Sequence, residues 1–111
     1  MHVSEWTEVG DSAANAAQTL TRAAPNGRAH TVTAFQVTIS GADAAADVTV
    51  ELKTGTDTKW KTVIGSGSTR GETVGAVFSS PLVCGYEEAV TLEVSAGGAD
   101  VVTSANLAGY T

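Results

Sequence analysis

Two histidines and one cysteine are the side chains in this sequence best suited to catalysis. A nucleophile needs a base and an orienting group brought close to it. His2 stands at the start of the sequence and His30 at the start of a predicted strand, and neither place suggests a catalytic base. Cys84 follows two apolar residues and precedes Gly85, which is the setting of a small core residue. We therefore predict no catalytic residue and no enzymatic activity.

Metal and phosphate sites are not predicted either. One cysteine and two distant histidines cannot complete a tetrahedral zinc site. Asp43 and Asp47 could share a cation at one loop, but they lack the alternating acidic ligands of a calcium loop. The glycine-rich stretch 65–71 has no P-loop lysine, has Arg70 where a dinucleotide fingerprint requires glycine, and continues as a strand. We expect neither a metal nor a cofactor.

Acidic pairs and aromatic residues leave one binding function open. Glu87 and Glu88 are adjacent, so on an extended strand they would point to opposite faces rather than together into a cleft. Trp60, Tyr86 and Tyr110 would form a binding platform if the fold placed them together on an exposed surface. A carbohydrate- or receptor-binding β-sandwich module is therefore the alternative function.

The charge balance argues against two classes of partner. The chain has 111 residues and a formal net charge of −6, whereas nucleic acids and anionic membranes attract clustered Lys and Arg. Acidic residues gather in 5–11 and basic residues in 53–70, so that opposite patches could meet between copies. The sequence shows no apolar run that would span a bilayer and no signal peptide, and its single cysteine suits a reducing cytoplasm. We expect no nucleic-acid and no membrane partner.

Alternation of apolar and polar residues with period two is the dominant structural signal, and it predicts antiparallel strands with one buried face. Breaks containing Gly, Ser or Pro separate the alternating runs. About eight strands are expected, at 18–23, 30–40, 47–54, 58–64, 72–78, 82–84, 89–95 and 101–110. We predict an all-β fold, an antiparallel β-sandwich of jelly-roll-like form. Strand order stays open, because Greek-key and meander connections share the same local signals.

The first seventeen residues do not fit this pattern. We expect an irregular N-terminal arm over 1–17, ahead of a β-sandwich domain over 18–111. A helix over 11–18 is the open alternative, because Asp11 is a suitable N-cap and alanine has a high helix propensity. The segment lacks large apolar residues at helical spacing, which favours an extended or loosely coiled arm.

The chain from His30 onward resembles a known class of protein. The resemblance is carried by residues 30–41, 47–53, 92–98 and 105–111, of which the closing Asn-Leu-Ala-Gly-Tyr is the most distinctive piece. These segments are similar to small accessory virion structural proteins of tailed bacteriophages and prophages, of the head-decoration, head-fibre or tail-accessory type. The resemblance does not extend to the N-terminal arm.

This resemblance implies a non-enzymatic structural component of a phage particle, a capsid decoration or head/tail accessory protein. It would be made in the cytoplasm of the host bacterium and located in the virion. The implied partners are copies of itself, with a trimer as one arrangement, and phage capsid or tail proteins. The acidic arm would dock on the capsid or on a neighbouring subunit, with Trp6 as an apolar anchor. The partner-binding residues expected on this hypothesis are Trp6, Glu5, Glu8, Trp60 and Tyr110.

Overall fold

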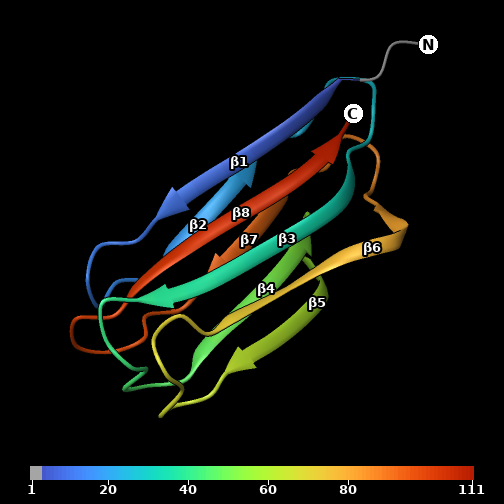
Figure 1. Ribbon diagram of the computed structural model, residues 1–111. Coiled ribbons are helices and arrows are strands. Elements are labelled where there is room, and N and C mark those ends of the chain that lie inside the picture. Colours follow the sequence, from blue (N-terminus) through green and yellow to red (C-terminus); the bar gives the residue numbers. More distant parts are fainter. Residues whose placement is uncertain (1–3) are drawn as a thin grey trace.

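All regular structure in the described residues is β-strand. The computed structural model describes residues 4–111. In chain order the strands are β1 (Glu5–Asp11), β2 (Gln18–Arg22), β3 (Thr31–Ser40), β4 (Val48–Thr54), β5 (Asp57–Ile64), β6 (Thr73–Val83), β7 (Val90–Val94) and β8 (Val102–Tyr110). Figure 1 shows them in two layers, so the predicted all-β sandwich is confirmed.

The strand order is that of one long hairpin rolled up. β1 pairs with β8, β2 with β7, β3 with β6 and β4 with β5, all antiparallel. Successive pairs alternate between the two layers, which gives one sheet in the order β1-β8-β3-β6 and another in the order β2-β7-β4-β5. This is the arrangement of an eight-stranded jelly roll, and it answers the question of strand order that local sequence signals leave open.

The core lies between the two sheets and follows the predicted alternation. In β4 the side chains of Val48, Val50 and Leu52 are fully buried, while the residues between them face partly into solvent. Phe35 on β3 is buried, and Phe78 on β6 is half-buried beside it, with ring centroids 6.1 Å apart. Burial of such side chains is the main favourable contribution to folding.

β6 corrects the prediction of two separate strands at 72–78 and 82–84. The strand runs from Thr73 to Val83, and its pairing with β3 shifts in register between Val32 and Ala34. Pro81 has no N–H to donate to a ladder, but it is tolerated on an edge strand and at a bulge. The expected interruption is therefore an irregularity within one edge strand.

β1 corrects the prediction of an irregular arm over 1–17. All seven of its residues are in register with β8, from Glu5 opposite Tyr110 to Asp11 opposite Ser104. The folded domain therefore begins with β1 rather than at residue 18. Residues 1–3 of the predicted arm, including His2, lie outside the described residues.

The connection from β1 to β2 is a turn, so the alternative of a helix over 11–18 is also wrong. The backbone N–H of Ser12 donates to the carbonyl of Thr103 at 2.8 Å, and that of Asn15 donates to the carbonyl of Val101 at 2.9 Å. These bonds hold the turn against β8 and the residue that precedes it. Asn15 adopts a φ of 51°, a left-handed conformation that asparagine tolerates better than most residues. These long-range bonds hold the alanine-rich segment in place of helical ones.

Candidate functional site

Three adjacent strands of one sheet carry no charged side chain. β8, β3 and β6 have 9, 10 and 11 residues, and none is Asp, Glu, Lys or Arg, although such residues make up 16% of the chain. The residues on the outer side of these strands form a surface that we call the uncharged face. Its central residues are Ala34, Gln36, Thr38, Thr73, Gly75, Val77, Ser104, Asn106 and Ala108.

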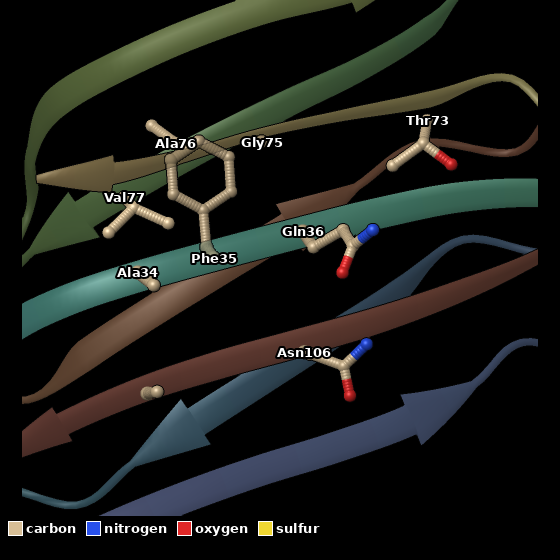
Figure 2. Close-up of a pocket in the computed structure, with 9 residues that line it drawn as sticks. Ala34, Phe35, Gln36, Thr73, Gly75, Ala76, Val77 and Asn106 are labelled. Carbon is tan, nitrogen blue, oxygen red and sulfur yellow. The ribbon is translucent and has the colours of Figure 1, made fainter.

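Strand register arranges the uncharged face in rows across the sheet. Gln36 lies opposite Asn106 on β8 and opposite Gly75 on β6. Figure 2 shows the two amides on neighbouring strands. The next row is formed by Ala108, Ala34 and Val77. Amide groups therefore lie beside small apolar side chains, with no ion to be desolvated when the face is covered.

The middle of the uncharged face is hollowed into an open groove of about 430 Å³ (Figure 2). The groove is lined by residues of β3, β6 and β8, among them Gly75, which has no side chain. A Cβ atom at Gly75 would collide with the carbonyl oxygen of Phe35, so glycine here allows the two backbones to approach closely. An open, uncharged trough can accommodate a complementary surface, but it offers no group for acid–base chemistry.

Exposed valines concentrate on the same sheet. Val77 and Val83 on β6 are 86% and 69% exposed, and Val9 on β1 is 68% exposed. Single exposed apolar side chains are common on soluble proteins. Three of them on one sheet that has so few charges indicate a surface suited to contact with another molecule.

The outer face of the second sheet is crossed by ion pairs instead. The Nζ atom of Lys53 lies 2.9 Å from Glu93 and 3.5 Å from Glu51, and Nζ of Lys61 lies 3.4 Å from Glu51. The hydrogen bond to Glu93 raises the pKa of Lys53, because it favours the charged ammonium. Lys53 and Lys61 are thus paired within the molecule. At these two residues the basic stretch 53–70, which could have met an acidic patch of another copy, is already neutralised within the molecule.

His30 and Thr111 form a pair of the kind that could activate a hydroxyl. Nδ1 of His30 lies 2.6 Å from Oγ1 of Thr111, and Nε2 lies 2.7 Å from the carbonyl oxygen of Ala23. Because a carbonyl only accepts, Nε2 carries a hydrogen, and in the neutral ring Nδ1 then accepts from the hydroxyl. The Nε1–H group of Trp6 donates to the same hydroxyl oxygen at 3.1 Å.

This hydrogen-bonded chain fastens four segments of the fold to one another. The group that Nε2 of His30 contacts is a neutral backbone carbonyl, whereas a catalytic triad has a carboxylate there that stabilises the imidazolium. Glu8 and Arg22 line the surface pocket that His30 and Thr111 also line, but they pair with each other at 3.0 Å. His30 itself is 2% exposed. We read the chain of hydrogen bonds as structural.

Trp6 corrects the prediction of a docking anchor. It is 6% exposed and belongs to the core, with Arg22 stacked 5.4 Å from its ring centroid. Its partner in the ladder is Gly109, where a Cβ would lie 2.7 Å from the indole Cζ2. The ring thus fills the space that a side chain would occupy on β8. Glu8 pairs with Arg22 at 3.0 Å and remains partly exposed, and its role in binding a partner stays a prediction.

The aromatic platform required by the alternative function does not form. Trp60 is half-buried, and its ring packs edge-on against Phe35 with centroids 4.6 Å apart. Tyr110 belongs to the outer side of β8, on the other sheet, and Tyr86 lies in the loop between β6 and β7. Of the predicted partner-binding residues, Glu5 and Tyr110 are brought together, opposite each other at one end of the sheet. Their role in binding stays a prediction.

The remaining polar candidates serve the loops. Asp47 accepts from the backbone N–H of Ser66 at 2.7 Å, and Asp43 accepts from that of Arg70 at 2.9 Å. The two aspartates thus hold the glycine-rich loop. Residues 4–111 contain no group of three or more His, Cys, Asp or Glu side chains that could hold a metal ion. In the same part of the chain no helix is long and apolar enough to cross a membrane.

Cys84 is buried, as predicted, at 5% exposure. Loss of solvation raises the pKa of its thiol to about 11, and the negative charge of Glu88 adds to this effect. The thiol is therefore a poor nucleophile at neutral pH.

The uncharged face was missed by reasoning from the sequence, although a signal for it exists. The segments 31–40, 73–83 and 102–110 contain no charged residue. They are far apart along the chain, so each alone resembles an ordinary strand. Only the pairing of β3 with both β6 and β8 shows that they form one continuous surface.

Comparison with known proteins supports the fold. No protein-family model matches the chain, and no curated protein matches its sequence. The chain is similar in structure to the crystal structure of PirA, with a TM-score of 0.51, 10% identity, and coverage of 95% of this chain and 92% of that chain. The X-ray structure of tomato aspermy virus gives a TM-score of 0.45 and 9% identity, covering 96% and 76%. At such low identity the likeness to PirA shows the fold alone.

Proposed function

We propose that this chain is a non-enzymatic structural component of a tailed-phage particle, a capsid decoration or head/tail accessory protein. It would act by assembling with copies of itself and by docking to other virion proteins. On this proposal it is made in the cytoplasm of the bacterial host and resides in the virion. The sequence resemblance over residues 30–111 supports the choice of a phage particle.

The observation that carries the structural role is the contrast between the two outer faces of the sandwich. One face has ion pairs among Glu51, Lys53, Lys61 and Glu93, as expected for a surface in contact with water. The other has none of these groups across three strands and exposes valines instead. Charged residues are depleted at the centre of protein interfaces, because each must be desolvated on binding.

A rigid sandwich with one uncharged face suits assembly rather than catalysis. His30 and Cys84, the histidine and the cysteine of the described residues, are buried, and the hydrogen-bonding capacity of the His30 ring is used within the fold. The groove on the uncharged face is lined by groups that neither donate nor accept protons near neutral pH. We therefore propose that the protein has no enzymatic activity and no cofactor.

Purified particles test the proposal. Phage from a host that carries the gene are separated on a density gradient and analysed by quantitative mass spectrometry. We expect the chain in a constant ratio to the major capsid protein across the particle peak, and its loss when the gene is deleted. Abundant chain in the cell lysate together with none in the particles would contradict the proposal. A gene position among capsid and portal genes is a further expected result.

A further inference from the structure

We propose that the uncharged face binds the same face of a second copy of this chain about a two-fold axis. The inference rests on the proposed role in self-assembly and names the surface that carries it. A contact between identical faces is isologous, so each group on one copy meets a group drawn from the same set on the other.

Electrostatics favours this face for contact between copies. Each chain carries a net charge of −6, so two copies repel unless their contact surfaces avoid charge. β8, β3 and β6 contribute none. The second sheet would instead bury the ion pairs that Glu51 and Glu93 make with Lys53 and Lys61. Each of these ions would have to be desolvated on binding, which opposes association.

The polar groups of the face can pair with copies of themselves. The amides of Gln36 and Asn106 both donate and accept, and so do the hydroxyls of Thr38 and Thr73, which already share a 2.8 Å hydrogen bond. Such groups satisfy one another whichever copy supplies the donor. The small side chain of Ala34 and the bare backbone of Gly75 allow a second sheet to approach to the roughly 10 Å spacing of packed sheets.

The whole sheet, which consists of the uncharged face and β1 beside it, is large enough for a specific dimer. Its four strands, spaced ~4.8 Å apart and each with about nine residues rising ~3.4 Å, project to roughly 19 by 30 Å, or about 570 Å² per copy, of which the uncharged face supplies about three-quarters. Two copies would bury about 1,100 Å² in total, just above the roughly 1,000 Å² that a specific interface requires. We therefore expect a reversible dimer rather than an obligate one.

The charges of β1 select the direction of the axis. Glu5 and Asp11 lie on the edge strand β1, whereas the opposite edge strand β6 is uncharged. An axis parallel to the strands, between β8 and β3, places β1 of each copy over β6 of the other. An axis across the strands would place β1 of one copy over β1 of the other, so that the carboxylates of the two β1 strands would face each other. We assign the first arrangement, which closes as a dimer and replaces the trimer suggested by the resemblance.

Two matched variants of the full chain test this interface. Val77→Glu adds a carboxylate to the uncharged face at a position 86% exposed, and Val63→Glu adds the same charge to β5 at a position 46% exposed. Sedimentation velocity over a concentration series should give a dimer for the wild type and for Val63→Glu. For Val77→Glu the apparent Kd should rise about tenfold or more. Circular dichroism and urea denaturation check that both variants are folded.

The possible outcomes separate this inference from the proposed function. A wild type that is monomeric or trimeric, or two variants with the same Kd, would overturn the two-fold interface. A monomeric wild type that still enters particles would overturn the interface and leave the structural role standing. A dimer disrupted by Val77→Glu but absent from particles would support the interface and contradict the role in the virion.

Discussion

Replacing Trp6 with alanine tests whether β1 is part of the folded domain or a separate arm. The indole is 6% exposed, and it fills the space above Gly109 on β8. A buried tryptophan covers about 150–250 Å², and removal of such a side chain from a core costs about 3–5 kcal/mol of stability. This loss includes the hydrogen bond from Nε1 to Thr111, a contribution of about 1 kcal/mol.

Urea denaturation followed by circular dichroism measures this loss. We expect Trp6→Ala to lower the free energy of unfolding by about 3–5 kcal/mol. Trp6→Phe keeps an aromatic ring but cannot donate to Thr111, so it should lose about 1–2 kcal/mol. Val9→Ala is the matched control on the same strand, because Val9 is 68% exposed, and it should change stability by less than about 0.5 kcal/mol.

An arm that docks on a partner would behave differently. If Trp6 were an anchor for the capsid or another subunit, Trp6→Ala would leave the stability of the isolated chain unchanged and would weaken only binding. A loss smaller than about 1 kcal/mol for Trp6→Ala, or equal losses for Trp6→Ala and Val9→Ala, would refute the placement of β1 in the core.

Three further predictions concern other parts of the sandwich. Gly75→Ala should destabilise the fold by about 1–3 kcal/mol in urea denaturation, because the new Cβ meets the backbone of β3. Gly65→Ala is the control, because nothing lies within 4 Å of the added carbon, and it should change stability by less than about 0.5 kcal/mol. Equal effects of the two substitutions would contradict the close approach of β3 and β6. The raised pKa of Cys84, about 11 instead of 9.0, should make the folded thiol react with a disulfide reagent at pH 8 about 100-fold more slowly than the unfolded chain does. The stability linked to the protonated thiol is present below pH 9 and lost as the pH rises toward 11, so wild type should lose more stability than Cys84→Ala over that interval; parallel curves would contradict a buried thiol. Lys53→Met leaves Glu51 and Glu93 opposite each other without their shared cation. The melting temperature of this variant should therefore fall at low ionic strength and recover in about 1 M salt. A loss that does not depend on salt would show that the lysine acts through packing.

Most of the sheet structure could be predicted from the sequence, because strands with one buried face reveal themselves by period-two alternation. β4 and β7 show this pattern along their whole length, and their buried residues are those expected. β1 could not be predicted as a strand, for a physical reason. Its larger apolar residues, Trp6 and Val9, are three apart, and Val9 faces solvent. The indole finds its place only because Gly109, a hundred residues later in the chain, leaves room for it.

The candidate site was harder to predict than the fold. Alternation indicates which side of a strand is buried, but it does not indicate which strands are neighbours. The uncharged face depends on β3 lying between β6 and β8, and that order follows from the rolled hairpin rather than from any local signal. Of the residues that attract attention by type, His30 is buried, and Trp60 is half-buried against Phe35. The surface left for function consists of alanine, threonine, valine and amide side chains.

Incorporation of variants into phage particles tests the central claim most directly. Cells with the gene deleted are complemented with wild type, Val77→Glu or Val63→Glu, and the chain in purified particles is quantified against the major capsid protein. If the uncharged face is the surface that makes the contacts of assembly, the amount of Val63→Glu in particles should reach the wild-type level. The amount of Val77→Glu in particles should be lower by about tenfold or more. Equal incorporation of the two folded variants would contradict the claim.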